Sequence, residues 1–122
     1  MELKVLTMFS DIDGEARCVE DAVEFRSNDH GLSLTAALIS PSESCRNFQY
    51  VELPVGFQSS GRIADIGQLA VCLAGKVEIT GASGEGYVLG AGGVFRLRKG
   101  KVSSHTIAVS GEAPVHLLVI QL

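Results

Sequence analysis

The stretch VELPVGFQSSGRIADIGQLAVCLAG, residues 51–75, decides how the rest of the sequence is interpreted. It opens with the end of an alternating apolar run, which Pro54 and Gly56 close. A polar segment follows, and the chain then enters residues 69–75, which are too apolar for a solvated loop. Apolar runs of this length, bounded by Pro and Gly, are typical of β-strands.

The composition of the whole chain agrees with a β-protein. Its 122 residues are enough to bury a core without disulfides, so we expect one domain spanning residues 1–122. Hydrophobic residues make up 46%, and there are 14 Gly against 3 Pro. This composition suits many short strands joined by tight turns better than a helical bundle. The predicted fold class is all-β.

Charge and cysteine content indicate which binding partners and which cellular compartment to expect. Ten Lys and Arg against fourteen Asp and Glu leave a net charge of −4, so we expect neither nucleic acid nor an anionic membrane as a partner. Cys18, Cys45 and Cys72 form no CxxC pair, which favours a reduced, cytoplasmic setting. No segment has the pattern of a signal peptide or the length of a membrane span.

Alternation and turn residues place the other strands. The sequence DIDG at residues 11–14 resembles the start of a calcium loop. An EF-hand needs a Gly at the sixth place and a distant Glu, and neither is there, so a turn is predicted. Residues 81–86 are predicted to form a hairpin turn, because no Gly-Lys-Ser/Thr follows them as in a phosphate-binding loop. Further strands are expected near residues 3–6, 18–25, 32–39, 47–53, 94–97 and 115–122.

Two spacings carry a resemblance to a known family. Gln68 lies seven residues before Gly75, and the sequence resembles a cupin, whose first motif has a glutamate seven residues before a glycine that closes a hairpin. In that register the two metal-binding histidines of the motif are replaced by Arg62 and Ala64. The resemblance implies a cupin-type jelly-roll barrel, also called a double-stranded β-helix.

The second cupin motif is altered in the same way. In the register that matches Gly92 and Gly100, Arg98 stands in the place of the proline and Ser103 in that of the histidine. His105 lies two residues further on, on the same face of a regular strand. The resemblance covers residues 48–122 and, more loosely, the N-terminal part. The sequence is similar to small bacterial cupins to which no function is attached.

The cupin register implies one set of residues facing the barrel interior. If Gln68 points inward, period-two alternation sends Cys72 inward as well, while Leu69, Val71 and Leu73 pack on the other side. The candidate ligand-binding residues are therefore Arg62, Gln68, Cys72, Ser103 and His105, with His105 also the candidate catalytic residue.

The chemistry of this set favours an anion over a metal. A metal site needs about three protein ligands, and His105 is the one good donor, so we expect no tightly bound metal and no cofactor. A guanidinium presents donors suited to a carboxylate, so Arg62 with Gln68 and His105 would suit a small organic anion. The structural alternative is that Arg62 faces solvent or pairs with Asp65, that His105 is a hydrogen-bonded core residue, and that Cys72 is a buried, inert thiol.

Three classes of function stay open. The first is a metal-free protein that binds a small organic anion. The second is an enzyme (an isomerase, lyase or dioxygenase-like protein) using His105 with or without an unconventional divalent metal. The third is a structural or interaction protein with a filled barrel. In each case we expect a homodimer, because residues 115–122 and the apolar residues Leu3, Val5 and Leu6 supply more apolar surface than one barrel covers.

Overall fold

The computed structural model describes residues 2–27, 38–64 and 67–122, and these residues form strands and turns without a helix. The turns bend where Gly or Pro interrupts an alternating run, as expected from their backbone preferences. The strands are β1 (Lys4–Ser10), β2 (Ala16–Ala22), β3 (Arg26–Ser27), β4 (Leu38–Ile39), β5 (Asn47–Leu53), β6 (Gln58–Ala64), β7 (Gln68–Ala74), β8 (Lys76–Thr80), β9 (Gly86–Leu89), β10 (Val94–Leu97), β11 (Gly100–Ser110) and β12 (Val115–Gln121).

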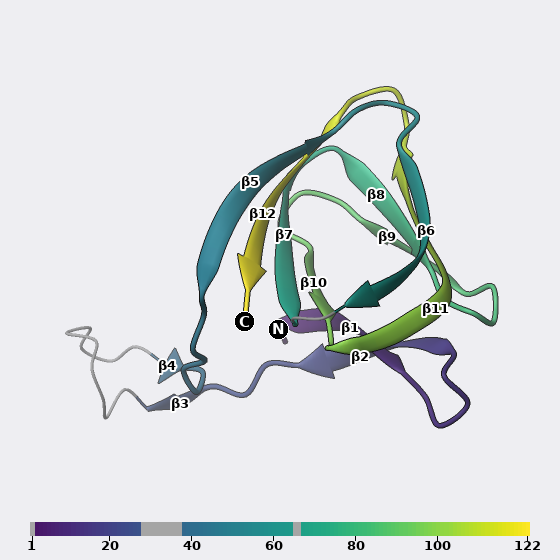
Figure 1. The fold of residues 1–122 in the computed structure, drawn as a ribbon. Helices are drawn as coiled ribbons and strands as arrows, with labels where there is room; N and C mark the ends of the chain where they lie inside the picture. Colours follow the sequence, from purple (N-terminus) through teal and green to yellow (C-terminus); the bar gives the residue numbers. More distant parts are fainter. Residues whose placement is uncertain (1, 28–37, 65–66) are drawn as a thin grey trace.

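Two sheets face each other and form the barrel (Figure 1). The larger has six strands in the order β2-β1-β10-β7-β12-β5, and the smaller has four in the order β6-β11-β8-β9. Neighbouring strands are antiparallel except for β1 and β10, which run parallel. Strands distant in the sequence therefore lie side by side, as in a jelly roll.

The core lies between the two sheets. One buried cluster contains Met8, Phe95 and Leu97 of the six-stranded sheet with Ile79 of the four-stranded sheet. A second cluster places Cys72 and Val115 against Val77. Ile107 of β11 packs against both clusters, so the interior is one continuous layer of side chains.

Several strand predictions are confirmed. The fourth predicted strand coincides with β5, where Phe48, Tyr50 and Glu52 are exposed while Leu53 on the other face is buried. The turn at residues 81–86 joins β8 to β9 as an antiparallel hairpin. The last strand, which is apolar on both faces, is central, because β12 pairs with both β5 and β7.

One part of the predicted motif needs correction. Gly75 was expected to close a hairpin, but the strands on either side of it, β7 and β8, belong to different sheets. Gly75 has a φ of 81°, which a glycine adopts without strain. The glycine of the motif therefore turns the chain from the larger sheet into the smaller one.

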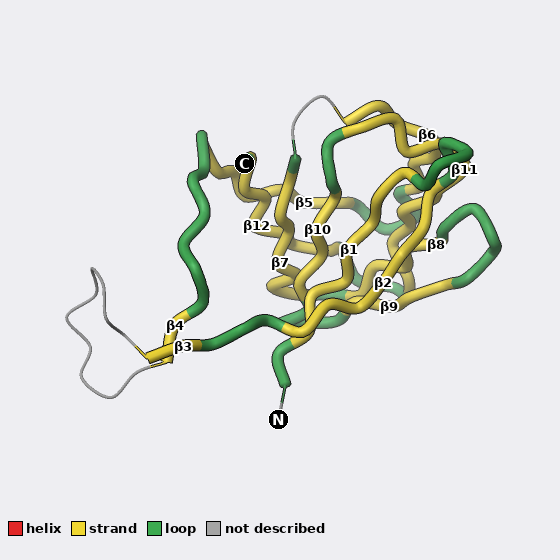
Figure 2. Tube along the Cα trace, turned by 90° about the horizontal axis from the view of Figure 1, so that it is seen from below, coloured by secondary structure: helices red, strands yellow, loops and turns green. Residues whose placement is uncertain are grey.

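A short two-stranded arm leaves the barrel. It consists of β3 and β4, which pair with each other and with neither large sheet. Figure 2 shows the arm to one side of the barrel. The predicted third strand, residues 32–39, falls mostly outside the described residues, and its end, Leu38–Ile39, is β4.

The described residues include no helix that is long and apolar enough to cross a membrane.

Candidate functional site

β7 directs two of the predicted site residues toward the interior. Cys72 belongs to the buried core, and Gln68 stands four residues before it on the same face of the strand. Gln68 also pairs with Leu97, another core residue, and is half-buried at the start of the strand. The structure thus places both side chains on the inner face of the larger sheet, Cys72 in the middle of the barrel and Gln68 at its end.

The environment of Cys72 is that of a structural thiol. Its side chain is 1% exposed, and its Sγ lies 3.6 Å from the carbonyl oxygens of both Ala74 and Gly75. Burial raises the pKa of the Cys72 thiol, which keeps it protonated and poorly nucleophilic. These contacts agree with an inert thiol that holds the turn after β7.

His105 is buried in the opposite sheet, with 1% of its surface exposed. It lies two residues before Ile107, which contacts both core clusters. The regular alternation assumed for residues 103–107 is interrupted, however. Val102 of β11 pairs with Arg62 of β6, and Thr106 pairs with Ser60, so β11 uses more residues than β6 between these two pairs. A bulge therefore surrounds His105, and bulges of this kind re-aim side chains next to functional sites.

The side chains of two other predicted residues, Arg62 and Ser103, lie outside the described part of the structure, as do those of residues 61–64 and 100–104 in general. Their backbones are described: Arg62 is in β6 and pairs with Val102 of β11, the residue before Ser103. Arg62 is also six residues before Gln68, at the end of the barrel where β6 leads into β7. The backbone therefore brings these two positions close to His105 and Gln68 along the chain and across the strand pair.

The donor set does not fit a divalent metal. Over the residues that the structure describes, no group of three His, Cys, Asp or Glu side chains could hold an ion. His105 is the one imidazole of the predicted set, and the thiol of Cys72 is kept protonated by burial. We therefore derive no chemistry through a metal.

The DIDG segment is a turn, as predicted. Asp11 Oδ1 accepts hydrogen bonds from the backbone N–H groups of Asp13 at 2.9 Å and Glu15 at 3.0 Å. Asp11 Oδ2 accepts a third from Nε of Arg17 at 2.8 Å. The carboxylate thus closes the connection from β1 to β2 and carries no calcium chemistry.

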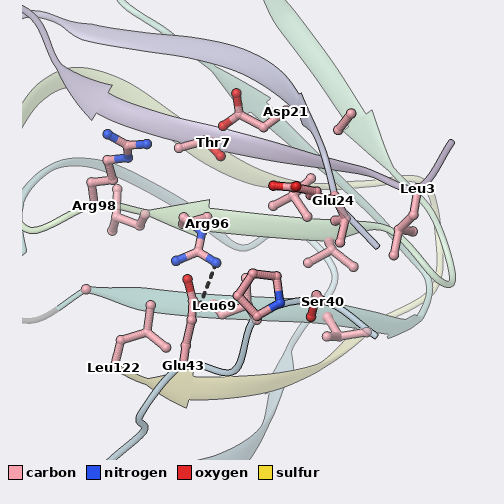
Figure 3. Close-up of a pocket in the computed structure, with 18 of the residues that line it drawn as sticks. Leu3, Thr7, Asp21, Glu24, Ser40, Glu43, Leu69, Arg96, Arg98 and Leu122 are labelled. Carbon is pink, nitrogen blue, oxygen red and sulfur yellow. Dashed lines mark hydrogen bonds and ion pairs between the residues drawn. The ribbon is translucent and has the colours of Figure 1, made fainter. Parts of the chain in front are cut away.

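The structure also contains a groove that the sequence analysis missed. Its volume is about 960 Å³, and it lies on the outer side of the larger sheet, away from Cys72 and His105. Figure 3 shows Arg96 in its centre, with Nη2 2.9 Å from Oε2 of Glu43. The signal for the groove was the outward set Leu69 and Val71, which is as apolar as the inward set.

Comparison with known proteins identifies the fold. No family model and no curated protein matches the sequence. Among solved structures, the cupin domain of Cnp3 from Schizosaccharomyces pombe aligns with a TM-score of 0.54 at 18% identity, covering 97% of this chain and 85% of that one. A predicted oxalate decarboxylase from Thermotoga maritima aligns with a TM-score of 0.52 at 18% identity, covering 98% and 92%.

A third structure, the DMSP lyase DddQ from Ruegeria pomeroyi, aligns with a TM-score of 0.54 at 16% identity, and the match spans 81% of this chain but 55% of DddQ. At these identities the likeness shows the fold alone. The two facing sheets and these alignments define a cupin jelly-roll fold, as the motif spacing predicted.

Proposed function

We propose that the protein binds a small organic anion inside its barrel without a tightly bound metal. The observation that carries this proposal is His105, a polar ring that is 1% exposed in an otherwise apolar interior. Its ring already has an interaction within the structure, and a polar group held inside the barrel is also one that a bound ligand can contact. Gln68 lies on the inner face of the opposite sheet, at the end of the barrel, and supplies an amide that a ligand entering there could contact.

Arg62 supplies the preference for an anion in this proposal. Its backbone pairs with Val102, three residues before His105. A guanidinium in a partly desolvated barrel binds a carboxylate or phosphate through paired, charge-assisted hydrogen bonds. We also propose a cytoplasmic location, supported by three free thiols in the described residues, Cys18, Cys45 and Cys72.

Calorimetry against a panel of small organic acids and inorganic phosphate tests this function. We expect the Arg62→Ala variant to bind about ten- to a hundredfold more weakly than the wild type, because a charged hydrogen bond is worth roughly 1.5–3 kcal/mol. The matched control is Arg46→Ala, which removes the same charge from an exposed position. Equal indifference of the wild type and both variants to every acid would favour a filled barrel instead.

Elemental analysis and native mass spectrometry of protein purified without a chelator distinguish the two ligand-binding classes. A co-purified small acid without metal supports the proposed function. A stoichiometric metal lost in a His105→Ala variant would favour the enzyme alternative, in which His105 acts as a ligand or as a general acid or base.

A further inference from the structure

The groove on the outer side of the larger sheet has an apolar floor. Val71 of β7 pairs with Val94 of β10, and both side chains line the groove, as does Leu69 two residues before Val71. Leu3 and Val5 extend this floor at the start of β1. The volume of about 960 Å³ lies in the range of pockets that hold drug-sized molecules. The floor therefore suits a ligand that has an apolar part.

Arg96 brings a positive charge into this floor. In the sheet it pairs with Thr7 of β1 on one side and with Leu69 of β7 on the other, so neither neighbour carries a charge. Its side chain is 25% exposed and lies in the centre of the groove (Figure 3). A guanidinium that is partly removed from water interacts more strongly with an anion than an exposed one does. Arg96 is therefore the group of the groove that would hold a negatively charged ligand.

The carboxylate of Glu43 shows which kind of group Arg96 accepts. Its Oε2 lies 2.9 Å from Nη2 of Arg96, although the two residues are 53 positions apart in the chain. Glu43 belongs to residues 40–43, which follow β4 and form a wall of the groove. Its side chain is 53% exposed, and ion pairs with such exposed partners contribute little to stability. A carboxylate from solution can therefore take the place of Glu43.

The other charges of the groove are unevenly distributed. Glu24 is paired with Arg26 of β3, whose Nη2 lies 2.9 Å from its Oε1. Arg98 and Lys99 directly follow β10, and within the described residues neither side chain forms an ion pair. Asp21 is the remaining carboxylate of the lining, and it lies on β2, which β1 separates from β10. The β10 side of the groove therefore has an excess of positive charge.

We propose that this groove is a second binding site, for a small carboxylic acid with an apolar tail. The carboxylate binds Arg96 in place of Glu43, and the tail lies along the apolar floor at Val71 and Val94. Glu43 then acts as a competitor within the chain itself. The site is separate from the barrel interior, because side chains alternate along β7 and Cys72, the residue after Val71, is buried in the core. It does not depend on the anion binding proposed for the barrel.

Isothermal titration calorimetry of the full chain with three probes tests this site. Octanoate carries both parts of the proposed ligand, acetate has the carboxylate without the tail, and 1-octanol has the tail without the charge. We expect octanoate to bind at least about tenfold more tightly than either of the others, because each of them lacks one of the two contacts.

Two variants are expected to change the affinity for octanoate in opposite directions. Arg96→Ala removes the cation and should weaken binding at least about tenfold. Glu43→Gln keeps the size of the side chain but removes the competing charge, so it should tighten binding about two- to fivefold. If the ion pair served only to hold the wall of the groove, both variants would break it and both would weaken binding.

The matched controls are Lys76→Ala and Glu78→Gln, which make the same changes of charge at exposed positions of β8, in the smaller sheet. Both should leave the affinity for octanoate unchanged, and circular dichroism should show that every variant keeps its strands. Octanoate that binds no more tightly than acetate or 1-octanol would overturn the proposal, and so would weaker binding by Glu43→Gln. Binding that is lost in Arg62→Ala but unchanged in Arg96→Ala would also overturn it, and would support binding in the barrel instead.

Discussion

At the scale of single residues, Asp11 shows how one carboxylate organises a turn. Its two oxygens accept hydrogen bonds from the Asp13 and Glu15 backbones and from Arg17. The hydrogen bond from Arg17, followed by that from the Glu15 backbone, lowers the pKa of Asp11 below its ordinary value. The turn from β1 to β2 is therefore stabilised by the ionised form of this residue.

The Asp11→Asn substitution tests this account through its pH dependence. A carboxyl group whose folded pKa is lowered stabilises the fold above the unfolded pKa of about 3.9 and loses that effect as pH falls through the folded pKa. We expect the variant to have a lower Tm than the wild type at pH 7. The difference should shrink as pH falls below about 4 and vanish below the lowered folded pKa, where the wild-type carboxyl group is neutral as well. Thermal unfolding followed by circular dichroism from pH 2 to 8 measures it.

Asp13→Asn provides the control for that experiment. Asp13 belongs to the same turn, is exposed, and its carboxylate makes no hydrogen bond or ion pair within the described residues. Its substitution should leave the Tm unchanged at every pH. A Tm difference for Asp11→Asn that stays constant from pH 2 to 8 would show that the charge of Asp11 has no part in the stability of the turn.

At the scale of elements, the connection from β7 to β8 is the most constrained turn. A Cβ on Gly75 would lie 2.5 Å from the carbonyl oxygen of Pro114 and 3.0 Å from Cα of Val115, which are both backbone atoms. Val115 is the first residue of β12, which pairs with β7, and Pro114 directly precedes it. The turn at Gly75, which leads from the larger sheet to the smaller one, therefore packs directly against the backbone at Pro114 and Val115. Only glycine fits at this position.

We expect Gly75→Ala to destabilise the protein far more than Gly92→Ala. Gly92 has a φ of 87°, close to that of Gly75, but nothing lies within 4 Å of its Cβ position. Both variants have the cost of a left-handed backbone, about 1–2 kcal/mol, and Gly75→Ala adds a backbone overlap of about 1–3 kcal/mol. Urea unfolding of the two variants at one protein concentration gives the comparison, and equal losses would show that the contact with Pro114 is unimportant.

The bulge in β11 is the second element that matters for the site. Between Val102 and Thr106 the strand holds more residues than the facing segment of β6, and His105 lies within this stretch. Extra residues bend a strand and increase its twist. His105 is therefore buried within an irregular stretch of β11, and regular strand alternation does not by itself place it there.

At the scale of the whole molecule, the two surfaces of the larger sheet have different roles. The inner side contributes Gln68 and Cys72 to the barrel, while the outer side carries Arg96 and Thr7, which line the groove. Because side chains alternate along each strand, a substitution on one face leaves the other face in place. The proposed binding in the barrel and the groove on the outer side of the sheet can thus be tested with separate variants.

The metal content of the purified protein is a prediction for the whole molecule. We expect less than stoichiometric zinc, iron, nickel and manganese, because Arg62 and Ala64 replace two ligands and Gln68 is a weak one. Elemental analysis by plasma mass spectrometry provides the measurement. Near-stoichiometric metal that is lost on substitution of His105 would contradict it.

The sequence by itself determined the all-β class, several of the strands and turns, and the cupin fold. Alternation in residues 47–53 predicted both the bounds of β5 and its exposed face, and the spacings from Gln68 to Gly75 and from Gly92 to Gly100 indicated a cupin. These features are local, because each depends on side-chain period or on a turn within a few residues.

Only the tertiary structure decided the assembly of those strands. It showed that Gly75 connects two sheets, that β11 contains a bulge at His105, and that Leu69 and Val71 line a groove with Arg96 and Glu43. The physical reason is that strand pairing joins residues distant in the chain, and the sheet neighbours of a strand determine whether its apolar face is covered. Apolar residues on both sides of β7 and β12 were visible in the sequence, but which side remained open depended on the partners that these strands acquired.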